Sequence, residues 1–182
     1  TREPVGFGKA GLATVKKKLS AAHEFFEDIL HIDTREMGVK KEKSRRARYD
    51  NFDSICMSGN ESVGVYVHEI AHHLEYKNKE IFDAAKAFLK ERAGDEPMRK
   101  MSSDFTWKTG YKANEVGVKD EVDKAFGTDA RYVGKYYPYN TEIISMGLQK
   151  MYDEPVRFAA QDPEYFNFIV GVVTGQFGGK RT

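Results

Sequence analysis

Two histidines four residues apart, with a glutamate directly after the first, lie in VGVYVHEIAHHLEYKN at residues 63–78. In a helix, residues four apart differ by about 40° around the axis and about 6 Å along it, so His68 and His72 project from one face and can bind one ion. Glu69 lies about 100° around the helix from His68, where it can reach a water on that ion. This H-E-x-x-H spacing is typical of a zinc site in which the intervening carboxylate acts as general base.

A surface helix that happens to carry histidines is the alternative interpretation. With 5 histidines in 182 residues, a shuffled chain contains this motif with a probability on the order of 1%. The apolar neighbours Val67 and Ile70 predict that the helix is buried, and a chance copy of the motif within such a helix is rarer still. His73 points to a different face, and we expect it to pack on the helix or to support the site from outside. The pattern therefore favours a metal site.

Zinc in a catalytic site takes three protein ligands and leaves one position open for water. His23 and His31 lie on an earlier amphipathic segment, where packing or surface roles suit them better. The residues after His72 lack the continuation that would supply a third histidine, and Glu75 lies too close on the same helix, off its metal-binding face. We therefore expect a carboxylate from a later helix. Glu142 is the candidate, because IISMGL after it allows close helix packing, although a first-turn glutamate can also simply complement the helix dipole.

The spacing of apolar residues predicts the elements that position these groups. The first half should contain an amphipathic helix within residues 11–32, a hairpin from segments 46–50 and 54–58, a helix from Glu61 to Tyr76 capped by Ser58 or Asn60, and a helix from Lys79 to Arg92 ended by Gly94 and Pro97.

The second half should be irregular before it becomes helical again. Residues 98–140 look loop-rich, with 130–139 as the one strand-like segment. A helix capped by Asn140 or Thr141 should end before Pro155, and a last helix should begin with Asp162 as its cap and Pro163 at its first position. We expect the tail after this helix to be frayed.

At this point a resemblance to a known family is apparent. HEIAHHLE, followed later by YYPYNTEIISMGLQKMYDEPVRFAAQDPEYFNFI, resembles the glutamate-zincin (gluzincin) metallopeptidase domain of the anthrax lethal factor type. It is more similar still to the metallopeptidase-like domains of bacteriophage head and structural proteins. The similarity covers roughly residues 45–175. The H-E-x-x-H part occurs in many unrelated zinc proteases, whereas TEIISMG is found in far fewer families and is the main basis for the resemblance.

The resemblance implies an α+β, zincin-like fold, mostly helical with a small β-sheet or hairpin beside the metal-binding helix. It implies a zincin-like metallopeptidase domain at residues 45–182, preceded by an N-terminal helical extension, residues 1–44, packed on the domain or leading into it. The zinc ligands it implies are His68, His72 and Glu142, with Glu69 as general base.

Lethal-factor-like enzymes also place a tyrosine upstream of the third ligand to stabilise the oxyanion. Tyr136, Tyr137 and Tyr139 all lie in that region here, and we favour Tyr137 first and Tyr136 second. The chain departs from the family at Met146, since lethal factor carries a second acidic residue one turn after its ligand glutamate. Support of the site by neighbouring groups should therefore differ.

These features favour a zinc-dependent metallopeptidase that acts on a protein or peptide substrate, with phage or prophage association and phage structural proteins as suggested partners. The alternative is a catalytically silent zinc-binding domain with a structural or assembly role in a phage-like particle. A regulatory protease of the phage-repressor-cleaving type is less favoured, because such enzymes bring their third carboxylate closer in sequence than Glu142.

Composition excludes other classes. The formal net charge is +1 and no apolar run approaches the eighteen or so residues of a membrane helix, so we expect a soluble protein without a membrane partner. The opening residues lack a secretory apolar segment, which favours a cytoplasmic or virion-associated location. The basic cluster from Lys40 to Arg48 has charge of both signs and no stacking platform, so a solvated connector is favoured over nucleic-acid binding. The single cysteine, Cys56, should be a buried small hydrophobe.

Overall fold

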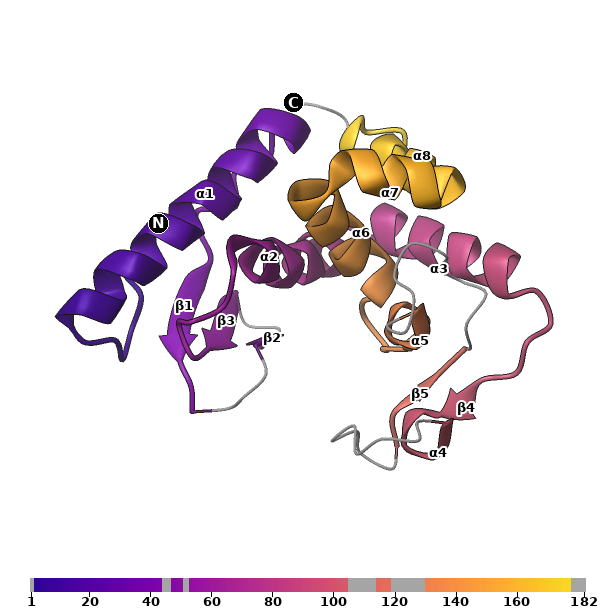
Figure 1. Ribbon diagram of the computed structural model, residues 1–182, viewed down its shortest axis with the longest axis horizontal. Coiled ribbons are helices and arrows are strands. Elements are labelled where there is room, and N and C mark those ends of the chain that lie inside the picture. Colours follow the sequence, from indigo (N-terminus) through magenta and orange to yellow (C-terminus); the bar gives the residue numbers. More distant parts are fainter. Residues whose placement is uncertain (1, 44–46, 51–52, 105–113, 119–129, 178–182) are drawn as a thin grey trace.

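The chain folds as a mostly helical α+β protein around one central helix, α2 (Val63–Lys77), in the computed structural model (Figure 1). The structure describes residues 2–43, 47–50, 53–104, 114–118 and 130–177. Helix α1 (Lys9–Leu30) packs on one side of α2, and α6 (Glu142–Asp153) packs against it over a more extensive contact. Almost every α2 residue from Gly64 to Glu75 is buried, as expected for a helix covered from several sides.

The amphipathic pattern of the first helix is confirmed. Val15, Leu19, Ala22 and Phe26 are spaced three or four apart and are almost fully buried, so they form the stripe that packs on the core. The helix ends where His31 adopts a left-handed conformation with φ 53°.

A three-stranded sheet lies beside α2, in the order β1-β3-β2. The predicted hairpin is confirmed by the antiparallel pairing of β2 (Arg48–Tyr49) with β3 (Ser54–Met57). Strand β1 (Gly38–Lys41) pairs in parallel with β3 and was not predicted. Its second half, Lys40 and Lys41, is exposed, so this segment resembles a connecting loop in the sequence. The strand could not be predicted because a short parallel strand depends on a partner that is distant in sequence.

The helices around the motif begin and end close to where the sequence predicts. The N-cap of α2 is Ser62, not Ser58 or Asn60, because Ser58 instead donates from its backbone and hydroxyl to the Glu61 carboxylate. Asn78 caps the start of helix α3 (Lys79–Ala93) by accepting from two backbone N–H groups, and Gly94, with φ 57°, caps its end.

The least regular part contains only short elements in the residues that the structure describes. They are β4 (Arg99–Lys100), α4 (Met101–Asp104), β5 (Val116–Gly117) and α5 (Ala130–Val133). The strand predicted at 130–139 is wrong at its start, which is helical. Only isolated bridges at Lys135 and Tyr136 remain, because β5 offers just two residues for pairing. Most of the loop-rich region predicted at 98–140 lies outside the described residues.

The last helices close the fold over α6, and the two predicted helix starts are confirmed. Thr141 is the N-cap of α6, and Asp162 caps α8 (Pro163–Val173) by accepting from the Tyr165 N–H. Helix α7 (Pro155–Gln161), between them, was not predicted as a separate element. A Cβ at Gly147 would collide with Ile169, so this glycine permits the close approach of α6 and α8.

One hydrophobic cluster joins these elements. It includes Leu19 of α1, Val39 of β1, Ile70 of α2, Ile144 of α6 and Ile169 of α8. Residues before 45 therefore contribute to the same core as the rest. No helix within the described part of the chain is both long and apolar enough to cross a bilayer. The frayed tail predicted at 178–182 lies outside the described residues.

Candidate metal centre

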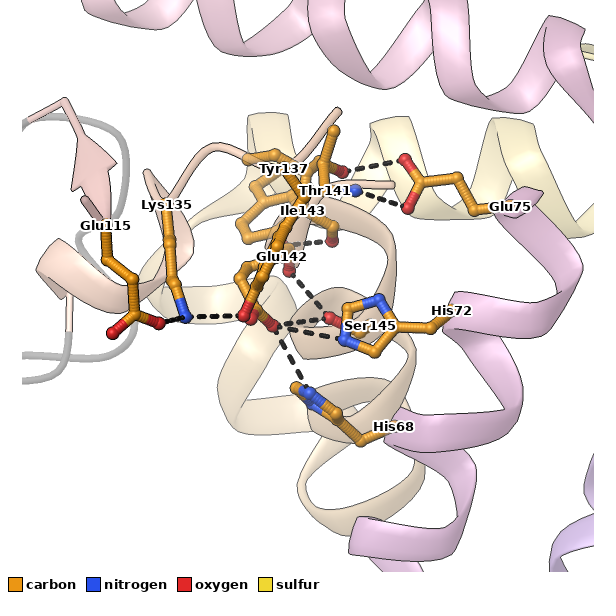
Figure 2. A network of polar contacts seen from close by, with 11 residues as sticks. His68, His72, Glu75, Glu115, Lys135, Tyr137, Thr141, Glu142, Ile143 and Ser145 are labelled. Atoms are coloured by element: carbon orange, nitrogen blue, oxygen red, sulfur yellow. Dashed lines mark hydrogen bonds and ion pairs between the residues drawn. The ribbon is translucent and has the colours of Figure 1, made fainter. Parts of the chain in front are cut away.

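Helices α2 and α6 bring together the three predicted ligands. His68 and His72 project from α2 toward α6, and their Nε2 atoms lie 3.2 Å and 3.5 Å from Oε2 of Glu142 (Figure 2). The histidines are 6% exposed and Glu142 is fully buried. A Cβ at Gly64 would collide with the Asp153 carboxylate, so that glycine allows the start of α2 to approach the end of α6.

The donor atoms fit a metal ion in both chemistry and spacing. Two imidazole nitrogens and one carboxylate oxygen form a common zinc-binding set, with bonds of about 2.0–2.1 Å. In a tetrahedron with such bonds, neighbouring donor atoms are about 3.3 Å apart. The two observed separations bracket this value, and one donor atom from each residue lies within 4.8 Å of the others. The second carboxylate oxygen of Glu142, Oε1, is buried and has no hydrogen-bond partner among the described residues, which suits a carboxylate that binds a cation.

The charges of the three groups support one another. Burial would raise the pKa of Glu142, but the charge and hydrogen bonds of His72 and His68 hold it well below its ordinary value. Burial likewise lowers the pKa of His68, and Glu142 more than offsets this, so that it is raised. The site therefore places a buried anion between two imidazoles. A divalent cation bound between the three side chains would satisfy all three donors at once.

Groups around the ligands hold Glu142 in position. Ser145 lies one turn along α6 and donates its hydroxyl to Glu142 Oε2 over 2.9 Å. The residue four positions after Glu142 is Met146, which is partly buried against the core. Support of the ligand therefore comes from the hydroxyl three residues after it, not from a carboxylate four residues after it.

Glu75 connects the two helices directly. Its buried carboxylate accepts from the Thr141 N–H over 2.6 Å and from the Thr141 hydroxyl over 2.8 Å (Figure 2). Thr141 is the N-cap of α6 and precedes Glu142, so Glu75 fixes the start of the helix that carries the third ligand. Burial raises the pKa of Glu75 to about 8, although both bonds from Thr141 oppose this. Glu75 is not one of the three donors that lie within 4.8 Å of one another, but it positions the site through Thr141.

Glu69 lies next to the ligands in a largely buried environment, with 5% of its surface exposed. Burial raises its pKa, while the positive charges of His68 and His72 oppose the shift. A raised pKa makes a carboxylate a stronger base, which suits a group that takes a proton from water. Glu69 therefore has the environment expected of a general base.

The two tyrosines predicted to assist the site lie in different surroundings. The Tyr137 ring stands edge-on to the His72 ring, with centroids 6.1 Å apart, and its hydroxyl accepts from the ammonium of Lys135 (Figure 2). Tyr136 is 45% exposed, and its backbone pairs with Val116 and with Thr141. Tyr137 therefore lies beside one of the predicted ligands, whereas Tyr136 is largely exposed.

No protein-family model, curated protein or solved structure matches the chain. What this chain does must therefore be inferred from the chemistry of its own residues.

The other histidines do not join the centre. His23 is buried, and its Nδ1 lies 2.6 Å from the Thr34 hydroxyl; burial lowers its pKa to about 4. It lines a cavity of about 450 Å³ beside α1, whose charged lining includes the ion pair of Lys16 with Glu3. His31 is exposed at the end of α1. Packing and surface roles, as predicted, describe both.

His73 belongs to a separate group with Glu36 and Asp53. Its Nδ1 lies 3.0 Å from the Tyr49 hydroxyl and its Nε2 lies 3.2 Å from Glu36 Oε1. Burial lowers the pKa of His73, although Glu36 and Asp53 oppose the shift. This arrangement ties α2 to β2 and to the loop before β1.

Sequence reasoning missed three groups that support the centre: Glu75, Ser145 and Lys135. Glu75 and Ser145 each lie three residues after a ligand, which is the spacing of neighbours on one helix face. That spacing could have identified Ser145. Lys135 carries no such pattern, because its contacts depend on how a loop folds back.

Proposed function

We propose that this chain is a zinc metallopeptidase, with His68, His72 and Glu142 as ligands and Glu69 as general base. The observation that carries the proposal is the convergence of three buried donor atoms, from two helices far apart in sequence, at separations suited to tetrahedral zinc. Zinc, when bound, would lower the pKa of a water toward about 7 and polarise the peptide carbonyl.

The residues of the chain would perform the remaining steps. Glu69 would take a proton from the attacking water and return it to the leaving amine. Tyr137 would donate its hydroxyl to the carbonyl oxygen as negative charge develops there. Ser145 and Glu75 would hold Glu142 in place, and so keep the ligand set ordered between turnovers.

Replacing Glu69 with Gln tests this proposal. The amide has the same shape but cannot accept a proton, so Glu69→Gln should bind zinc normally and lose about 10²–10⁴-fold in turnover. Turnover would be measured on a peptide library by mass spectrometry and zinc by elemental analysis. Glu91→Gln, at an exposed position on α3, is the matched control and should leave both unchanged. Full turnover in Glu69→Gln would contradict the assignment of the base.

A structural zinc domain is the second candidate, favoured by the nearly complete burial of all three ligands. The same experiment separates the two. One zinc per chain with no cleavage by the wild type, and no exchangeable water on the metal, would favour a structural or assembly role. Association with phage particles rests on the sequence resemblance alone.

A further inference from the structure

Lys135 is a buried cation beside the candidate site. Its side chain is 2% exposed, and its Nζ lies 2.6 Å from the Tyr137 hydroxyl and 2.5 Å from Oε1 of Glu115. Lysines are almost never fully buried unless they are paired, because taking an ammonium out of water is costly. The same ammonium lies 4.4 Å from the centre of the Tyr137 ring. The burial of the Lys135 ammonium beside Tyr137 therefore suggests a role for its charge.

Two glycines bring this charge into place. The Val118 N–H donates to the Gly134 carbonyl and the Tyr136 N–H donates to the Val116 carbonyl, which pins the segment before the site onto β5. A Cβ at Gly117 would lie 2.9 Å from the Gly134 oxygen, and one at Gly134 would collide with Val118. Only glycines permit so close an approach of the two backbones. Their approach sets Glu115, which precedes β5, opposite Lys135.

The direction of the bond to Tyr137 is fixed by chemistry. An ammonium can only donate, so the Tyr137 oxygen is the acceptor and its own hydrogen turns away from Lys135. The ring of Tyr137 stands edge-on to the ring of His72, and in Figure 2 its hydroxyl is turned toward Lys135. A hydrogen bond from the charged ammonium to the phenol oxygen also makes the phenol O–H a stronger donor.

We propose that Lys135 is a positioning residue, which orients the Tyr137 hydroxyl and strengthens its donation to the carbonyl oxygen of the scissile bond. Glu115 balances the charge and so allows Lys135 to be buried. This inference rests on the proposed peptidase function. Lys135 does not contact the substrate in this proposal and acts only through Tyr137.

A double-mutant cycle tests the inference. The wild type, Lys135→Met, Tyr137→Phe and the double variant are compared on the library peptide that the wild type cleaves fastest. Because losing one oxyanion donor costs about 10²–10³-fold in kcat, Tyr137→Phe should lose about this much and Lys135→Met at least about tenfold. KM and zinc content should stay within twofold, and the double variant should equal Tyr137→Phe.

A binding measurement supplies a second readout. A phosphonamidate analogue of the same peptide mimics the transition state and should bind more weakly to Lys135→Met by the same factor as kcat falls. Calorimetry should show no such loss when Lys135→Met is added to Tyr137→Phe. Lys90→Met, at an exposed position on α3, is the matched control. If Lys135→Met does not fold, the pair Lys135→Met with Glu115→Gln keeps the charge balanced and replaces it throughout the cycle.

The outcomes are distinct. An equal loss from Lys135→Met in the wild-type and Tyr137→Phe backgrounds would overturn the inference, since Lys135 would not act through Tyr137. A loss of kcat that follows loss of zinc would also overturn it, because the role would be structural. A wild type that cleaves no peptide would overturn the proposed function, and this inference with it.

Discussion

The adjacent residues His72 and His73 belong to two different groups of side chains of the kinds that bind metals. His72 points to α6 and joins His68 and Glu142, whereas His73 points to the sheet and joins Glu36 and Asp53. In both groups a histidine and at least one carboxylate lie close enough to share an ion.

The groups differ in what their donor atoms already do. Both ring nitrogens of His73 have partners, and Asp53 pairs with Lys77 over 3.1 Å. Glu36 is 61% exposed. In the α2–α6 group, by contrast, all three residues are buried, and Glu142 keeps an oxygen without a partner among the described residues. Residue type and proximity therefore do not suffice to identify a metal centre. Buried donors that the protein itself leaves unsatisfied are the better criterion.

Removal of a ligand should have the largest effect. His68→Ala and Glu142→Ala should weaken zinc binding by more than the roughly 100-fold that is the upper range for supporting groups, because each removes a donor atom outright. Elemental analysis and a competition titration with a chromophoric chelator would measure this. A wild type without zinc, both as purified and after titration, would remove the basis for the centre.

Loss of the link between α2 and α6 should have the next largest effect. Glu75→Ala leaves the Thr141 N–H buried without its acceptor and frees the start of α6. We expect a loss of about 10–100-fold in zinc affinity and of about 1–3 kcal/mol in the unfolding free energy. Competition titration and urea unfolding measure the two effects. Unchanged zinc affinity would show that Glu142 is positioned without Glu75.

Glu75→Gln is the matched control, since the amide can still accept from the Thr141 N–H. The difference in unfolding free energy between this variant and the wild type, followed against pH, also reports the pKa of Glu75. Burial raises that pKa from 4.5 to about 8, so the wild type is stabilised below pH 4.5 and loses this contribution as pH rises toward 8. In metal-free protein, Glu75→Gln should lack this fall, which is on the order of 3 kcal/mol at pH 7. Parallel stability curves for the two proteins would contradict the shift.

Changes in the second group should have the smallest effect on zinc. Glu36→Gln removes an exposed carboxylate and should leave zinc affinity unchanged, with at most about 1 kcal/mol lost in unfolding free energy. Competition titration beside Glu142→Ala measures the contrast. A second zinc per chain that disappears in Glu36→Gln would break the distinction between the two groups.

The sequence predicted most of the helical framework and the three candidate ligands. Val15, Leu19 and Phe26 mark α1 by their spacing, and Asp162 with Pro163 marks the start of α8, because these signals are local. Strand β1 was missed and the strand at 130–139 was placed wrongly, since short strands depend on partners elsewhere in the chain.

The sequence by itself determined that His68 and His72 share a helix face, because helical geometry fixes the direction of side chains four residues apart. It also indicated that a carboxylate must come from further along the chain. Only the tertiary structure decided that Glu142 meets both histidines and that the ring of Tyr137 lies against His72. The packing of α6 on α2 likewise brings Glu75 to the start of α6, and the folding of 134–135 onto β5 buries Lys135 beside Tyr137. These contacts join residues distant in sequence or lie in irregular backbone, where no local periodicity specifies the direction of a side chain.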